Sequence, residues 1–213
     1  MPRKKDVTGA CMDAALSLAA IGGWNNVTLY DIATEAGIEV GEAAKAIGGR
    51  NGALRHLTTR ADEAMLAAVD EDWGEESVRD RLFALLMARF DFLKTRREGL
   101  RAVLAGLPGD PAVAVMTAAG PGLKSMRLAL EAAGVTSAGL QGRLRARALG
   151  LAYASVMRTF LDDDSDDLSR TMAALDRQLG RLQNMAERFR FGRRRLRGEA
   201  GNGGEPESDT LEG

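Results

Sequence analysis

Apolar residues recur every three or four positions along most of this chain, which is the spacing that gathers them on one face of an α-helix. The longest such stripes predict helices over residues 7–21, 53–73, 75–97, 140–161 and 166–189. In the last of these, the apolar positions alternate strictly by three and four, as in a helix that packs along its length against near-parallel partners. The pattern therefore predicts an all-α protein of about nine helices.

Two shorter helices near the N-terminus are indicated by local signals. Thr28 is followed three residues later by Asp31, a capping box that opens a helix, and Gly37 ends that helix after about two turns. A second short helix is predicted from Val40 to Ile47. Together with the preceding helix, this pair makes the three-helix unit whose third helix can enter a DNA major groove. Spacing alone fits a plain helical hairpin equally well.

Glycine and proline punctuate residues 106–122, which predicts a loop, a short helix near Pro111 and a kink at Pro121. The next helix is expected to end at Gly134. After Phe191 the chain is arginine-rich and then almost free of apolar residues, as in a disordered tail. The expected organisation is a helix-turn-helix domain over residues 1–52, a larger helical domain over 53–191 and the tail over 192–213.

The composition indicates in which compartment the protein acts and which kinds of partner it can bind. Apolar residues make up 45% of the chain and aromatic residues only 5%, which suits helix-on-helix packing. The formal net charge is −1, so any basic surface must be local. The single cysteine, Cys11, fits a reducing compartment, and the opening MPRKKD lacks the apolar run of a signal peptide. No apolar stretch approaches the roughly 18–20 residues of a membrane span, so we expect a cytoplasmic protein without membrane insertion.

Residues 14–57 carry a family resemblance. The motifs are AAL (14–16) before a glycine-containing turn, Thr28, DIA (31–33) and EAGI (35–38). This segment resembles the N-terminal domain of TetR-type transcriptional regulators. The resemblance implies a repressor that binds a palindromic double-stranded DNA operator as a homodimer. It also implies that the helical body binds a small apolar ligand, which releases the DNA, and that the last two helices pair with their copies as a four-helix bundle.

The resemblance also implies which residues contact DNA. Gly41 stands where the recognition helix of the family carries a glycine, and Arg50 stands where it carries a basic phosphate contact. The recognition helix departs from the family at Ile47, in place of an aromatic residue, and at Ala44, in place of a tyrosine. Residues 1–60 hold seven lysines and arginines against six acidic residues, a thin excess for neutralising phosphates. The expected DNA-binding residues are Lys4, Lys5, Thr28, Tyr30, Gly41, Glu42, Lys45 and Arg50.

Two further sets of residues are expected in the body. Thioether side chains adapt to varied ligands, so methionines at helical spacing indicate either a pocket or plain core. The expected pocket residues are Met65, Met87, Phe90, Met116 and Met126. The dimer is expected to form through apolar positions on the last two helices, namely Leu149, Tyr153, Val156, Phe160, Met172, Leu175, Leu179 and Leu182.

A second resemblance leaves an alternative function open. Residues 144–181 resemble the C-terminal part of lipid-binding proteins of coenzyme Q (ubiquinone) biosynthesis, through features such as the Tyr153 helix, Leu161 with two following aspartates, and Thr171. Those proteins share the TetR-type fold, hold an isoprenoid lipid and do not read DNA. The alternative is therefore a lipid-binding protein with a non-functional helix-turn-helix.

The candidate chemistry for an enzyme is weak. Counted from Asp162, an EF-hand would need glycine at position 167 and glutamate at position 173, where the chain has Asp167 and Ala173. These aspartates are better explained as caps for the last helix. His56 is the only histidine, so neither a zinc site nor a Cys–His pair has sequence support. We expect no catalytic site, no metal and no cofactor.

Overall fold

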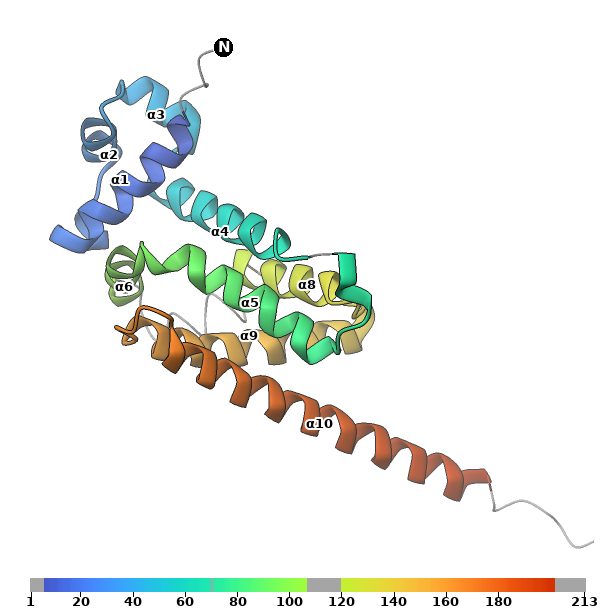
Figure 1. Ribbon diagram of the computed structural model, residues 1–213. Helices are drawn as coiled ribbons and strands as arrows, with labels where there is room; N and C mark the ends of the chain where they lie inside the picture. The colour runs from blue at the N-terminus through green and yellow to red at the C-terminus, as the bar shows by residue number, and fades with distance from the viewer. Residues whose placement is uncertain (1–5, 70, 107–119, 202–213) are drawn as a thin grey trace, which may run out of the picture.

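A computed structural model describes residues 6–69, 71–106 and 120–201. Over these ranges the chain forms nine α-helices, two short 3₁₀ helices and no strand, which confirms the predicted fold class. Helices α1–α3 form a small unit at one end, and α4 leads from that unit into the body (Figure 1). The helices are α1 (Val7–Gly22), α2 (Leu29–Ala36), α3 (Val40–Ile47), α4 (Arg50–Leu66), α5 (Val78–Lys94), α6 (Arg97–Ala105), α8 (Pro121–Ala132), α9 (Gly139–Leu161) and α10 (Ser169–Gly201).

Local chemistry defines the ends of α2 and α3. The Thr28 hydroxyl accepts a hydrogen bond from the Asp31 amide, and the Asp31 carboxylate accepts one from the Thr28 amide at 3.0 Å, which completes the predicted capping box. Gly37 ends α2 with φ at 65°, and Gly48 ends α3 with φ at 67°. Both values lie in the left-handed region that favours glycine.

Several predicted boundaries are wrong. Helix α4 ends at Leu66 rather than near residue 73, and the single helix expected over 75–97 is α5 followed by a separate α6. Pro121 does not kink a helix but begins α8, where its missing N–H has no intrahelical partner to lose. The short helix expected near Pro111 lies outside the described residues.

The last helix also differs from its expected bounds. It begins at Ser169 rather than residue 166 and runs to Gly201, past residue 192, where the tail was predicted to begin. In Figure 1 this end of α10 projects well beyond the body.

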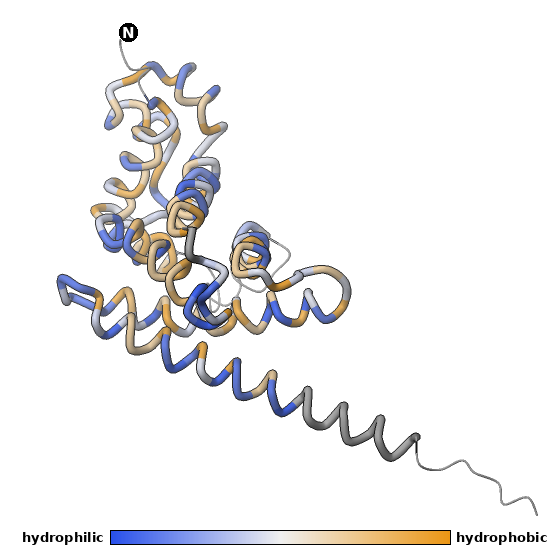
Figure 2. The backbone as a smooth tube through the Cα atoms, turned by 45° about the vertical axis from the view of Figure 1, so that its right-hand side comes forward, coloured by the Kyte–Doolittle hydropathy of each residue, from blue (hydrophilic) through white to orange (hydrophobic). Residues whose placement is uncertain are grey.

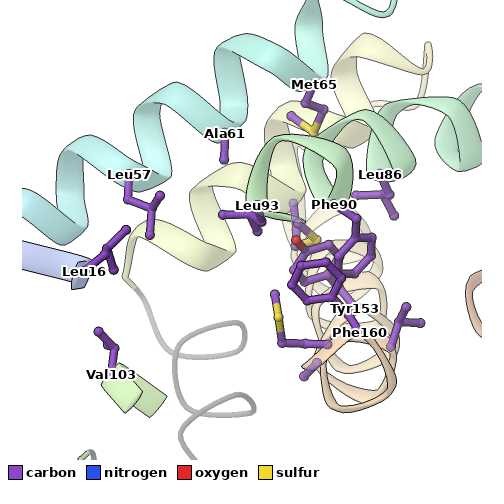
Figure 3. Packing of buried hydrophobic residues seen from close by; sticks show 14 of the residues in the cluster. Leu16, Leu57, Ala61, Met65, Leu86, Phe90, Leu93, Val103, Tyr153 and Phe160 are labelled. Carbon is purple, nitrogen blue, oxygen red and sulfur yellow. The ribbon is translucent and has the colours of Figure 1, made fainter. Parts of the chain in front are cut away.

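The core of the body is built on three aromatic rings. Phe90 on α5 stacks on Tyr153 of α9 with ring centroids 4.7 Å apart, and Phe160 lies 5.0 Å from Phe90 (Figure 3). Figure 2 shows polar and apolar residues interspersed along the helices, and the buried apolar side chains of these helices form one core cluster. No helix over the described ranges combines the length and hydropathy that a bilayer crossing needs.

Helix α6 joins the small N-terminal unit to the body. A Cβ added at Gly99 would lie 2.6 Å from the carbonyl oxygen of Leu16, so α6 can approach α1 this closely only through glycine. Beside this contact, the Arg96 guanidinium donates to the Asp13 carboxylate at 2.8 Å. The break between α5 and α6 thus coincides with a contact between parts of the chain that are distant in sequence.

Candidate nucleic-acid interface and ligand site

Helix α3 turns one face outward. Its Ala43 and Ile47 side chains are buried against the neighbouring helices, and α3 packs on α1, α2 and α4. The remaining face is exposed along most of the helix and carries Val40, Gly41, Glu42, Ala44 and Lys45. A helix held from behind with a free outer face has the form that groove recognition requires.

The outer face of α3 carries small residues together with one acidic and one basic side chain. Among the described residues, no non-neighbouring heavy atom lies within 4 Å of the position that a Cβ on Gly41 would take. The backbone at Gly41 is therefore open to close approach by a second molecule. Glu42 and Lys45 stand three residues apart, and no salt bridge of the described residues engages either of them.

Arg50 is held within the protein. Its guanidinium donates hydrogen bonds to the carbonyl oxygens of Trp24 at 3.1 Å and Asn25 at 2.8 Å, and it lies 5.6 Å from the centre of the Trp24 ring. Arg50 therefore ties the start of α4 to the turn between α1 and α2. Sequence reasoning assigned it to phosphate contact and could not detect this second role.

The other expected DNA contacts fall into two groups. The Thr28 hydroxyl donates to the Asp31 carboxylate as part of the α2 cap, whereas Tyr30 is 67% exposed on the first turn of α2. Lys4 and Lys5 lie outside the described residues. Of the expected set, Tyr30, Gly41, Glu42 and Lys45 thus reach the surface, and within the described part of the chain the side chains of Tyr30, Glu42 and Lys45 make no hydrogen bond.

A buried polar cluster in the body was not predicted. Arg89 on α5 is only 4% exposed and forms a salt bridge with Asp62 of α4. The second oxygen of Asp62 accepts a hydrogen bond from the Ser125 hydroxyl of α8 at 2.9 Å. The Arg89 guanidinium also lies 5.8 Å from the centre of the Tyr153 ring. Four helices therefore contribute to one group of polar side chains, in which Arg89, Ser125 and Tyr153 are buried and Asp62 is half-buried.

The sequence held a usable signal for this cluster. Arg89 follows Leu82 by seven residues and Leu85 by four, which places it on the buried face of α5. A charged residue at such a position needs a partner inside the protein. Burial raises the pKa of the Tyr153 phenol, while the positive charge of Arg89 acts in the opposite direction, and the phenol keeps its proton.

The chain was compared with known proteins. No protein-family model and no curated protein matches it. A TetR transcriptional regulator from Nitrosomonas europaea ATCC 19718 is 24% identical, with a TM-score of 0.63 over 81% of this chain and 95% of that chain. A TetR transcriptional regulator from Rhodococcus sp. RHA1 is 18% identical, with a TM-score of 0.51 over 83% of this chain and 97% of that chain. The chain has the TetR-type fold. The resemblance of its C-terminal part to the coenzyme Q lipid-binding proteins stays a prediction.

Most of the dimer residues expected from the sequence are covered within the single subunit of this TetR-type fold. Leu149, Tyr153, Val156, Phe160, Leu175 and Leu179 are buried in the core of the single subunit, and Met172 and Leu182 are half-buried. A second copy cannot cover side chains that their own subunit already covers. Among the residues of α9 and α10 up to 188, the large apolar side chains that are exposed are instead Leu140, Leu144, Leu151 and Met185.

The expected pocket residues lie in the core of the TetR-type body. Met65, Met87, Phe90 and Met126 are all buried in one apolar cluster, and Met116 lies outside the described residues. One hollow of about 370 Å³ with described walls lies between α1 and α6, and another of about 370 Å³ lies beside α2 and α3. Neither hollow is lined by these four side chains.

Two of the five aspartates before α10, Asp163 and Asp167, accept hydrogen bonds from the start of that helix as predicted. The Asp163 carboxylate accepts hydrogen bonds from the amide and hydroxyl of Ser165 and from the amide of Thr171 at 2.7 Å and its hydroxyl at 2.6 Å. Asp167 accepts from the Ser169 amide at 3.1 Å. Burial alone would raise the pKa of Asp163, but the hydrogen bonds from Ser165 and Thr171 outweigh it and lower that pKa to about 2.

Proposed function

We propose that this chain is a TetR-type transcriptional regulator, most simply a repressor, that binds a palindromic DNA operator as a homodimer. A small ligand in the helical body releases the DNA. The observation that carries the proposal is the outward face of α3, exposed from Val40 to Lys45 on a unit of the TetR-type fold. In this proposal the protein binds DNA and a ligand and does not catalyse a reaction. It acts in the cytoplasm, where the DNA is accessible.

The side chains of α3 suit particular base pairs. In a major groove the Lys45 ammonium donates to the O6 and N7 atoms of guanine, and the Glu42 carboxylate accepts from the N4 amino group of cytosine. Gly41 allows the α3 backbone to approach, and the Ala44 methyl group can contact a thymine methyl group. The proposed half-site therefore contains a C·G pair read by Glu42 and Lys45.

Exposed apolar side chains support the homodimer. Leu140, Leu144 and Leu151 are spaced by four and seven residues, so they share one face of α9, and Leu144 and Leu151 are 57% and 50% exposed. Large exposed apolar patches mark surfaces that another molecule covers, and a two-fold dimer covers the same patch on both subunits. We assign this α9 face, with Met185 of α10, to the contact between copies.

Helix α4 offers a physical route from ligand to DNA. It packs on α1 and α3 at one end and on α5 and α8 at the other, and it carries Asp62 of the buried polar cluster. A ligand that moves α4 would therefore change the separation of the two α3 helices in the dimer. Because the two α3 helices of the dimer must enter the grooves of one DNA duplex together, a changed separation between them weakens operator binding.

The DNA-binding test uses the full chain and a fluorescent duplex chosen by selection from random sequences. Lys45→Ala should weaken binding about 5- to 150-fold, the range for one specific base contact. The matched control is Lys124→Ala, which removes an exposed lysine from α8. Equal binding by the two variants would overturn the assignment of α3 as the reading helix.

The dimer test is sedimentation velocity at fixed protein concentration. Replacing Leu144 and Leu151 together by aspartate should yield monomers, because buried like charges would face each other across the two-fold axis. Leu66→Asp on α4 is the control and should leave the dimer intact. A double variant that still sediments as a dimer would contradict the proposed interface.

A further inference from the structure

The buried cluster leaves two hydrogen-bond donors without an acceptor. Arg89 Nε and the Tyr153 hydroxyl are buried, and neither makes a hydrogen bond within the described part of the chain. Arg79, Arg81, Arg97 and Arg127 also have an unpaired Nε, but those residues are only half-buried, and water can reach their surroundings. Arg89 and Tyr153 differ because they are 4% and 0% exposed and lie against each other.

Unpaired donors at such depth need an explanation. Each of them gave up hydrogen bonds to water when the protein folded, and no acceptor of the described residues replaces that water. The remaining atoms of the cluster are well satisfied, since Asp62 accepts from both Arg89 and Ser125. Arg89 Nε and the Tyr153 hydroxyl therefore remain as two donors that no acceptor of the described residues meets.

We propose that the body binds an apolar molecule through a neutral carbonyl oxygen, which accepts hydrogen bonds from Arg89 Nε and the Tyr153 hydroxyl. This inference rests on the proposed function, because it names the chemical class of the ligand that releases DNA. The site lies where α4, α5, α8 and α9 meet.

Charge balance selects a neutral group over a carboxylate. The single positive charge of Arg89 is already matched by Asp62 in a salt bridge whose Arg89 side is buried and whose Asp62 side is half-buried. A carboxylate ligand would place two anions against one cation where water is scarce, at a high desolvation cost. A ketone, ester, lactone or amide carbonyl supplies the missing acceptor without adding charge.

The surroundings select an apolar remainder for the ligand. Phe90 stacks on Tyr153, and Met65 and Met126 belong to the same fully buried cluster, as Figure 3 shows for Phe90, Tyr153 and Met65. Methionine side chains rearrange readily because they are unbranched and have three rotatable bonds. The core can therefore open around a ligand of modest size while keeping apolar contact with it.

The experiment compares cyclohexanone with cyclohexanecarboxylate, using ligand-observed NMR on the full chain. The ketone should bind, and it should bind more tightly than the carboxylate. Tyr153→Phe should weaken ketone binding at least fivefold, whereas Tyr30→Phe, which alters the only other tyrosine, should leave it unchanged. No ketone binding, tighter binding of the carboxylate, or equal binding by both variants would each overturn the inference.

Thermal unfolding of the same variants provides a check that needs no ligand. Because the Tyr153 hydroxyl has no acceptor in the described chain, its removal should leave the Tm unchanged or higher. A clearly lower Tm would show that the hydroxyl is already bonded inside the protein and would also refute the inference.

Operator binding, measured on the same samples, separates this inference from the proposed function. A protein that binds its operator but not the ketone defeats the inference alone. A protein that binds the ketone through Tyr153 but selects no DNA sequence defeats the regulator proposal alone.

Discussion

Asp163 should make a large contribution to stability, and the replacement Asp163→Asn measures it. The carboxylate is fully buried at the corner between α9 and α10 and accepts four hydrogen bonds, two from Ser165 and two from Thr171. Asparagine keeps one oxygen but turns an NH₂ group toward the partners of the other oxygen. The Thr171 amide and hydroxyl would then lose their acceptor.

The magnitude follows from the pKa of Asp163. Hydrogen bonding lowers it from the usual 3.8 to about 2, even though burial acts in the opposite direction. A difference of this size corresponds to about 2 kcal/mol of folding free energy. Because the pKa is lower in the folded state, this contribution is complete above about pH 4 and is lost as the pH falls through about 2.

Urea unfolding between pH 2 and pH 7, at fixed protein concentration, tests the reasoning. Asp163→Asn should lower the free energy of unfolding at pH 7 by about 2–3 kcal/mol and should flatten its decline in acid. The control is Asp166→Asn, which removes the same charge from an exposed side chain nearby and should change stability little. Our account fails if Asp163→Asn costs no more than the control, or if the acid dependence is the same as in the wild type.

Two further replacements test the N-terminal unit. Gly99→Ala should lower the free energy of unfolding by about 1–3 kcal/mol, since its methyl group would push against the Leu16 carbonyl. The control Gly41→Ala should not lower it, because the space beside Gly41 is open. Equal free energies of unfolding in urea for the two variants would contradict the close packing of α1 on α6. Arg50→Gln should lower the free energy of unfolding by about 1–3 kcal/mol, because it removes the hydrogen bonds to the turn between α1 and α2. The control Arg55→Gln changes an exposed arginine and should not lower it. An unchanged Tm for both variants would show that Arg50 has no structural role.

Elements defined by local signals could be predicted from the sequence. The bounds of α2 and α3 follow from Thr28, Asp31 and Gly37, whose effects reach only a few residues along the chain. The break between α5 and α6 could not be predicted in the same way. It coincides with the contacts of Arg96 with Asp13 and of Gly99 with Leu16, which involve residues more than 80 positions apart.

The dimer surface and the polar cluster around Arg89 also depend on contacts between distant parts of the chain, which the sequence pattern does not reveal. The pattern showed that Leu149 and Leu175 are apolar, but it could not show whether their own subunit or a second copy covers them. The structure buries both inside the subunit and leaves Leu144 and Leu151 exposed on another face of α9. Arg89 is a charged residue on the apolar face of α5, and its partners Asp62 and Ser125 lie on other helices that the sequence pattern does not place beside it.

The measurement that tests the central claim most directly is selection of bound sequences from a pool of random double-stranded DNA by the full-length protein, followed by sequencing. Our account predicts enrichment of an inverted repeat whose two half-sites contain a C·G pair and are centred about one helical turn of DNA apart, or a multiple of it. Lys45→Ala should weaken the enrichment of the C·G pair within each half-site. Recovery of unenriched DNA by the wild-type protein would contradict the assignment of α3 as a DNA-reading helix.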